Sequence, residues 1–360
     1  MTLGEGACTP TASQKSVDKL GGGGNVARTC LAVADINPSP LEVATIMRRA
    51  GVSLIEVLVV LGLIGLLLAL ILPAVQSARM SSRRMTCQNH LRQLALGAAE
   101  YEATHGCLPG NGCIVACNSW LCAILPFVEL PGLAMRANLP MSPIFPDNPY
   151  QMDEARRPVP LFRCPSDVTT IPAEALWPTS YCGNAGTGLL SDGYNGLFRP
   201  CRPYTRNPDE LIGPVRSAEV TDGLSNTALA TEWLTGLEPL TRNRPLWRLD
   251  KSYSSVPEMA EACQSLPADP AQLGWESTFR GQTWTCFGMS NTLYNHALPP
   301  NRPSCSNNGA IFQGVITAAS QHPGGVNVAY ADGRVVFVSH DIDAQVWRAQ
   351  GSRSEPLLSE

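Results

Sequence analysis

An uninterrupted apolar run near the N-terminus constrains this chain most. The segment Val57–Leu72 contains no polar side chain, and its apolar character continues past Pro73. Together with Val52–Ile55, it reaches roughly the 20 residues that a bilayer-spanning helix requires. Glu56 is the one ionisable residue inside this stretch. We therefore expect a transmembrane helix over residues 52–75, with a carboxylate near its start that needs a charged partner.

Two other interpretations of the apolar run are a cleaved signal peptide and a plain single-pass anchor. The run is longer than the apolar part of a usual signal peptide, and Leu72–Gln76 matches a small-residue cleavage site poorly. Counting positive charges does not orient the span, because arginines stand on both sides of it. They are Arg48 and Arg49 before the span, and Arg79, Arg83 and Arg84 after it.

The residues around the start of the run favour a third interpretation. Arg48 and Arg49 are followed by Gly51-Val52-Ser53-Leu54-Ile55-Glu56, which resembles the processing motif of type IV prepilins. The resemblance implies that prepilin peptidase cuts after Gly51 and methylates Val52, although phenylalanine is usual at the latter position. It also implies that Glu56 meets the terminal amine of a neighbouring pilin-like subunit, which would leave neither charge unpaired in the membrane.

The resemblance makes residues 1–51 a leader that the mature protein lacks. Residues 1–46 have mixed charges, a run of glycines and no strong periodicity, as flexible chain does. Met47 opens a short peptide that would itself be a compact prepilin leader. Our hypothesis is that translation starts at Met47.

The helix is expected to continue beyond the membrane, over residues 76–106. No proline interrupts Ser77–Glu102, and apolar residues recur there at spacings of three and four. This stripe, which should pack on the rest of the protein, is formed by Cys87, Leu91, Leu94, Ala98 and Tyr101. Gly106 and Pro109 then end the helix.

Residues 107–360, called the head below, are expected to be rich in β-structure. Glycine and proline are abundant at 31 and 30 residues, and 44% of the chain is hydrophobic, which suits strands, turns and a packed core. The strongest pattern is a hairpin over residues 326–338, in which alternating apolar flanks enclose Asp332-Gly333. Residues 236–308 are weakly patterned, and we expect an insertion or an elaborate loop there. The predicted class is α+β and pilin-like.

The 13 cysteines are many for a reducing compartment. Disulfides are the favoured interpretation for an exported head. Zinc is the rival, but no Cys-x-x-Cys pair occurs, and the pairing of the cysteines cannot be deduced. Those after the span are Cys87, Cys107, Cys113, Cys117, Cys122, Cys164, Cys182, Cys201, Cys263, Cys286 and Cys305.

A set of motifs in the head resembles a large family of planctomycete prepilin-like proteins that contain a domain of unknown function. Its C-terminal signature is similar to His322-Pro323-Gly324-Gly325, followed nine residues after the histidine by Asp332-Gly333. Further segments of the family recur here in order: Cys87–Leu94, Thr104–Gly106, Ile124–Phe127, Cys164–Asp167, Asn184–Gly186 and Thr221–Thr227. The resemblance implies an architecture and an export route more firmly than an activity.

Chemistry at these motifs is the less favoured interpretation. His322 and Asp332 could act as an acid/base or metal-binding pair if the fold brought them together, but a turn at Asp332-Gly333 accounts for the same residues. Asp222, Ser225 and Asn226 could offer oxygen ligands to calcium, yet their spacing is not that of a calcium loop, and an Asx-turn suffices. We expect no metal and no cofactor.

The sequence gives no sign of an enzyme or of a nucleic-acid-binding protein. It contains no Gly-x-Ser-x-Gly elbow, zinc-protease helix or phosphate loop. The net charge of −4 argues against nucleic-acid binding. The expected function is a structural subunit of a type IV pilus-like fibre or a type II secretion-like pseudopilus. It would be single-pass in the inner (cytoplasmic) membrane, with the head in the periplasm or exterior. The alternative is a surface-anchored protein that binds a solute or a glycan.

Overall fold

The computed structural model of the chain describes most of the helix and the head. The described residues are 53–110, 119–136, 153–189, 194–199, 214–237, 241, 243–267, 275–277, 280–289, 291–308 and 310–354. The chain divides into two compact units, Met1–Leu61 and Gly62–Glu360. The expected leader 1–51 with Met47 and Gly51, the expected mature N-terminus Val52, and the cysteines Cys113, Cys117 and Cys201 lie outside the described residues.

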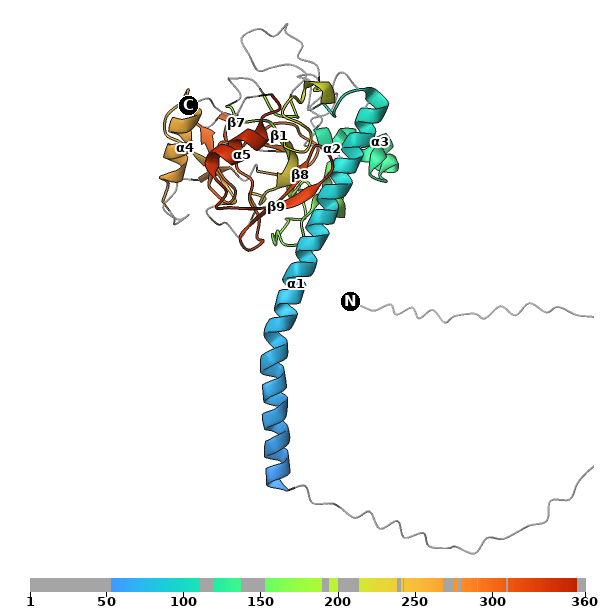
Figure 1. Cartoon of the computed structure of the whole chain (residues 1–360), viewed down its shortest axis with the longest axis vertical. Coiled ribbons are helices and arrows are strands. Elements are labelled where there is room, and N and C mark those ends of the chain that lie inside the picture. Colours follow the sequence, from blue (N-terminus) through green and yellow to red (C-terminus); the bar gives the residue numbers. More distant parts are fainter. Residues whose placement is uncertain are drawn as a thin grey trace, which may run out of the picture. The chain divides into compact units, whose positions relative to one another are not determined.

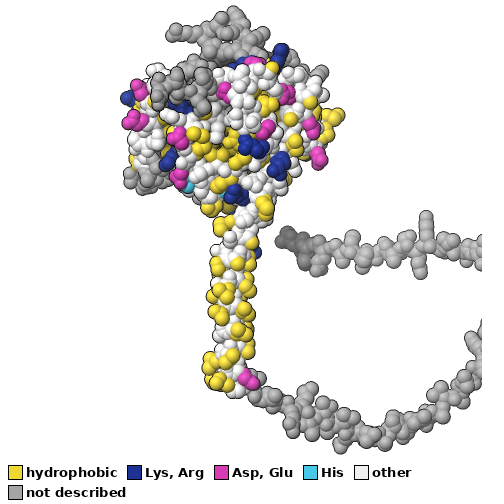
Figure 2. All heavy atoms as spheres, viewed as in Figure 1, with side chains coloured by type: hydrophobic (Ala, Val, Ile, Leu, Met, Phe, Trp, Pro, Cys, Tyr) yellow, Lys and Arg dark blue, Asp and Glu magenta, His cyan; other side chains and the backbone are white. Residues whose placement is uncertain are grey.

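A single helix, α1 (Leu54–His105), opens the described chain and is 52 residues long. Among the described residues it is the one helix long and apolar enough to cross a membrane. Pro73 lies within it. The side chains of its apolar N-terminal half are exposed on all faces, Leu58 and Leu68 by 59% and 60%. Figure 2 shows hydrophobic side chains along this part of the helix on the face in view. A protein that exposed this surface to water would aggregate, so the burial pattern suits a membrane anchor.

The C-terminal half of α1 packs against the rest of the Gly62–Glu360 unit. Its buried positions carry small or apolar side chains, which lets the helix approach closely. A Cβ on Gly97 would come within 2.6 Å of Val128. At the level of Arg84, the guanidinium lies 3.5 Å from the ring centroid of Phe337, a cation–π contact. The buried positions are Cys87, Leu91, Leu94, Ala95, Gly97 and Ala98, which include most of the stripe predicted from the sequence.

A five-stranded sheet forms the main core of the head, in the order β5-β1-β2-β8-β9. All its pairs are antiparallel except β1 with β5. The hairpin expected at residues 326–338 is formed by β8 and β9. Their pairing runs from Gly325 opposite Ser339 to Ala329 opposite Val335. The strands are β1 (Tyr181–Asn184), β2 (Ala228–Glu232), β5 (Leu293–Tyr294), β8 (Gly325–Tyr330) and β9 (Val335–Ser339).

A second, four-stranded sheet has the order β4-β3-β6-β7. Three of its strands lie within residues 236–308, where an insertion or an elaborate loop was expected, so the loop alternative is wrong. The strands are β3 (Leu246–Arg248), β4 (Trp275–Ser277), β6 (Ser304–Asn307) and β7 (Ala310–Val315). With α4 (Val256–Gln264), they enclose a separate apolar cluster around Trp247, Met259 and Val315. Strands of three or four residues are too short to show a clear alternation in sequence.

Short helices complete the head. The apolar segment after Ser119 forms α2 (Trp120–Ala123) and η1 (Leu125–Phe127), and Figure 1 shows α2 and α3 beside the C-terminal end of α1, with α4 distant from it. The last helix of the described chain is α5 (Ala344–Gly351), capped by Asp343. The others are α3 (Pro131–Arg136), η3 (Asp153–Arg156), η4 (Pro160–Phe162) and η6 (Ser217–Glu219). The described chain is therefore a mixed α+β protein with a long apolar N-terminal helix.

Candidate functional site

The proposed processing motif is described from Ser53 onward. Glu56 stands in the first turn of α1, where its Oε2 accepts a hydrogen bond from the backbone N–H of Ser53 at 3.0 Å. A carboxylate here satisfies one of the unpaired N–H groups at the start of the helix. Glu56 directly precedes the apolar run Val57–Leu72.

Asp332 and Gly333 make the turn between β8 and β9. Gly333 has a φ of +84°, a left-handed conformation that glycine adopts without a steric penalty. The Asp332 Oδ1 atom accepts a hydrogen bond from Arg334 N at 2.9 Å, as an Asx-turn does. This geometry matches the turn interpretation of the motif.

Pro323-Gly324-Gly325 leads into β8, where the backbone lies very close to that of β9. Gly324 has a φ of +90°, and a Cβ on Gly325 would lie 2.0 Å from the carbonyl oxygen of Val338. Both glycines are therefore required by the backbone rather than by a ligand.

His322 has a different environment from Asp332, and the two have different partners. The His322 Nε2 atom lies 3.2 Å from Glu232 Oε1, and the two side chains are only 3% and 1% exposed. The pair that the motif suggested, His322 with Asp332, is replaced in the structure by His322 with Glu232. Glu232 ends the apolar strand β2, and the single carboxylate in that strand was the signal that sequence reasoning did not use.

The Glu232 carboxylate is held by β8 and, through it, by α1. Its Oε2 accepts from the backbone N–H of Asn327 at 2.9 Å, and its Oε1 accepts from Asn327 Nδ2 at 3.0 Å. Asn327 Oδ1 in turn accepts from Gln88 Nε2 at 3.0 Å. A buried carboxylate with this many donors is fixed in position.

A disulfide lies against this pair. Cys87 of α1 is bonded to Cys164, which follows η4. The Cys164 Sγ atom is 3.6 Å from His322 Nε2 and 3.8 Å from Glu232 Oε1. These four side chains, called the Cys–His–Glu cluster below, are all buried and place one ligand atom each within 4.8 Å of the others.

The described residues contain two of the disulfides expected after the span, whereas Cys107, Cys122 and Cys182 are not disulfide-bonded. The second bond joins Cys263 of α4 to Cys305 of β6, so each apolar cluster of the head carries one. Cys122 and Cys182 are buried, and burial raises the pKa of the Cys122 thiol to about 12 and that of Cys182 well above its usual value. Such thiols stay protonated and are poor nucleophiles.

A cavity of about 450 Å³ adjoins the cluster. Its wall includes His322 and, from α1, Met80 and Arg83, together with Ser166 and Arg244. His322 is thus the member of the Cys–His–Glu cluster that lines the cavity.

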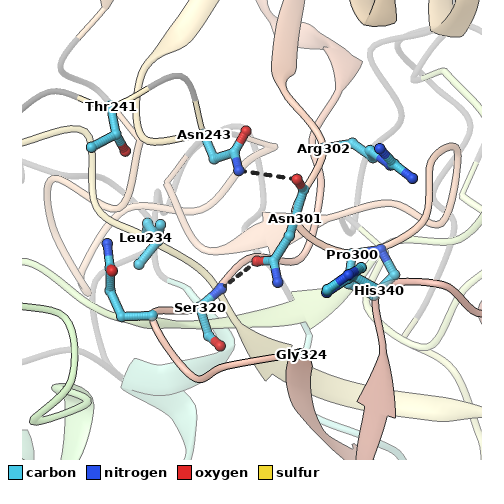
Figure 3. A pocket seen from close by; sticks show the side chains of 10 residues that line it. Leu234, Thr241, Asn243, Pro300, Asn301, Arg302, Ser320, Gly324 and His340 are labelled. Atoms are coloured by element: carbon cyan, nitrogen blue, oxygen red, sulfur yellow. Dashed lines mark hydrogen bonds between the residues drawn. The ribbon is translucent and has the colours of Figure 1, made fainter. Parts of the chain in front are cut away.

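A second cavity, of about 510 Å³, lies between the β3–β6 region and the residues before β8. Figure 3 shows Arg302 and His340 on one side of it and Thr241 and Leu234 on the other. Asn301 connects two other residues that line this cavity. The Asn301 carbonyl accepts a hydrogen bond from Asn243 Nδ2 at 3.0 Å, and Asn301 Oδ1 accepts one from Ser320 N at 2.8 Å. Amide, hydroxyl, guanidinium and imidazole groups here could bind a polar solute.

These features define a mixed α+β protein with an apolar N-terminal helix and a buried cluster of two cysteines, a histidine and a glutamate. Residues 76–345 match the family model described as "Protein of unknown function (DUF1559)". The chain belongs to this family, which is of the planctomycete type, and the family part of the predicted resemblance is confirmed. No curated protein and no solved structure gives a significant match.

Proposed function

We propose that the protein is a prepilin-like structural subunit of a type IV pilus-like fibre or a type II secretion-like pseudopilus. The observation that carries the proposal is the first half of α1. It is exposed and apolar on all faces, and Glu56 stands in its first turn. Such a surface requires lipid or other apolar helices around it, and a carboxylate there requires a positive partner. Membership of the family is consistent with this function without naming it.

In this proposal, residues 52–75 span the inner (cytoplasmic) membrane once and the head lies in the periplasm or exterior. Prepilin peptidase removes residues 1–51 after Gly51 and methylates Val52. Glu56 then pairs with the terminal amine of an adjacent subunit. The head has a structural rather than a catalytic role, and its disulfides suit an oxidising compartment.

The role of Glu56 is tested by Glu56→Ala, with Glu100→Ala, an exposed position on the same helix, as the matched control. Loss of the carboxylate should leave the protein in the membrane but lower its amount in sheared filaments by at least about tenfold, because a neighbour's amine loses its partner. Glu100→Ala should assemble normally. Equal incorporation of the Glu56→Ala and wild-type proteins would contradict the assembly role.

The cavity in Figure 3 favours a second candidate, a surface-anchored protein that binds a polar solute or glycan. Calorimetric titration of the full chain in detergent with a panel of neutral and acidic oligosaccharides tests it. Binding that is lost in Arg302→Ala, together with no filament association in cells, would support this candidate over the first.

A further inference from the structure

We infer that the Cys–His–Glu cluster is a zinc site whenever the Cys87–Cys164 bond is reduced, so that this position holds either a disulfide or a metal ion. The four ligands come from four segments far apart in sequence: α1, the turn after η4, the end of β2 and the approach to β8. The fold thus gathers a donor set, two thiolates, an imidazole and a carboxylate, that suits Zn²⁺.

The distances between the donor atoms fit a tetrahedral ion. A tetrahedron built with ordinary zinc bond lengths separates its ligand atoms by about 3.4–3.8 Å. The three separations among the ligand atoms of Cys164, His322 and Glu232 are close to these values. They are 3.2 Å for His322 Nε2 to Glu232 Oε1, 3.6 Å for His322 Nε2 to Cys164 Sγ, and 3.8 Å for Cys164 Sγ to Glu232 Oε1.

Reduction of the Cys87–Cys164 bond makes Cys87 available as the fourth ligand of the tetrahedron. Once the bond is broken, Cys87 Sγ is free to move from Cys164 to the spacing that two zinc-bound thiolates require, about 3.8 Å. Cys87 lies in the helix and has no exposed surface, so its sulfur has little other space to enter. All four coordination positions are then filled by protein, which is the arrangement of a structural rather than a catalytic zinc site.

The surroundings of the cluster hold the ligands in position. Asn327 donates to both oxygens of Glu232, and the Ser320 hydroxyl accepts from the backbone N–H of His322 at 3.0 Å. Contacts of this kind around the ligands raise the affinity of metal sites. The cavity of about 450 Å³ that His322 lines brings open space up to one of the four ligands.

The exchange between the two states balances with a dithiol as the reductant. The dithiol becomes a cyclic disulfide, and its two electrons and two protons convert the Cys87–Cys164 bond into two thiols. Binding of Zn²⁺ then releases the two thiol protons to water as the zinc–sulfur bonds form. Either the disulfide or the ion fixes α1 to the head, so the helix would stay attached in both redox conditions.

Co²⁺, which reports tetrahedral thiolate ligation by its absorption bands, tests the site in the full chain in detergent. The protein is reduced with a phosphine, freed of reductant without air and titrated with Co²⁺, then with Zn²⁺. We expect one tightly bound Co²⁺ that zinc displaces, and none in the oxidised protein. Cys263→Ser/Cys305→Ser, which lacks the other disulfide, should bind as the wild type does.

His322→Gln is the decisive variant, because it keeps the disulfide and its folding can be verified before reduction. Its Co²⁺ affinity should fall by at least about 100-fold. Changing a residue that only contacts a metal ligand lowers the affinity by up to about 100-fold, and loss of a ligand itself should cost at least as much. If reduction alone unfolds the wild type, zinc should refold it. The inference is overturned by a reduced wild type that neither binds Co²⁺ nor refolds with zinc, by equal binding in His322→Gln, or by equal binding in the oxidised protein.

Discussion

At the scale of single residues, Asp167 illustrates how the head fixes buried charge. Its carboxylate accepts hydrogen bonds from Arg244 at 2.6 Å, Arg163 at 3.1 Å, and the hydroxyls of Ser180 and Thr235 at 2.9 and 3.1 Å. The side chains of Arg244 and Asp167 are each 1% exposed. Removing one partner of such a pair leaves the other charge uncompensated.

We therefore predict that Asp167→Ala lowers the free energy of unfolding by about 3–5 kcal/mol. Chemical denaturation of the full chain in detergent, followed by tryptophan fluorescence, measures this. Asp341→Ala is the matched control, because the Asp341 side chain is 79% exposed. This substitution should leave the denaturation midpoint unchanged. An Asp167→Ala protein as stable as this control would show that the buried network contributes little.

His296 gives the head a defined dependence on pH. Tyr294 donates its hydroxyl to Nε2, and Nδ1 donates to the carbonyl of Trp347, both at 2.7 Å. Burial lowers the pKa of His296 to about 3. Because the unfolded chain binds a proton near pH 6.5 and the folded chain does not, this group makes the head less stable as the pH falls from about 6.5 to about 3.

His296→Asn removes the titrating group and should flatten that dependence. The variant is expected to be less stable than the wild type near neutral pH, and the difference should shrink by about 2 kcal/mol on going from about pH 7 to about pH 5. Denaturation at the two pH values measures it. A difference that is the same at both would mean that His296 is not kept neutral by its site.

The sequence identified some residues of the candidate site and missed others, for physical reasons. His322, Asp332 and Gly333 stood out because glycine and proline mark special backbone positions, and the turn at Gly333 is such a position. Glu232 and Asn327 did not, because a polar residue in a largely apolar strand shows its role only when the segments that surround it in the fold are known. The pairing of Cys87 with Cys164 depends on the whole fold in the same way.

At the scale of elements, the C-terminal half of α1 is held to the head by one face. Leu94 is fully buried, whereas Leu96, two positions further along the same helix, is 53% exposed. We predict that Leu94→Ala lowers the free energy of unfolding by about 2–5 kcal/mol, through lost burial and the cavity left behind.

Leu96→Ala makes the same chemical change on the outer face and is the control for this prediction. It should leave the denaturation midpoint of the head close to that of the wild type. Comparable losses in the two variants would mean that the docked face of α1 is not the one described.

Local and non-local elements were predicted with different success. The stripe on α1 and the β8–β9 hairpin arise from periodicity and turn chemistry within short stretches of chain, and both are found. The second sheet depends on β3 pairing in parallel with β6, from Leu246 with Ser304 to Arg248 with Ser306. In the chain these strands are separated by α4, β4 and β5. No local sequence pattern predicts such a contact, so an insertion or an elaborate loop was expected at residues 236–308.

At the scale of the whole molecule, the account rests on what happens at the N-terminus. An exposed apolar helix and a family of unknown function are both compatible with an anchor that is never processed. Only cleavage between Gly51 and Val52 would make Glu56 the partner of a subunit amine rather than a carboxylate in the first turn of an ordinary anchor. Replacement of Gly51, for example Gly51→Val, should leave the precursor uncut.

Mass spectrometry of the protein from membranes, with and without prepilin peptidase, tests the central claim most directly. With the peptidase, the account predicts an N-terminal peptide that begins at a methylated Val52. Without it, the predicted peptide retains Gly51, and a peptide from residues 1–46 in that precursor would exclude Met47 as the start. An N-terminus that does not change with the peptidase, or one that begins beyond the apolar run, would contradict the account.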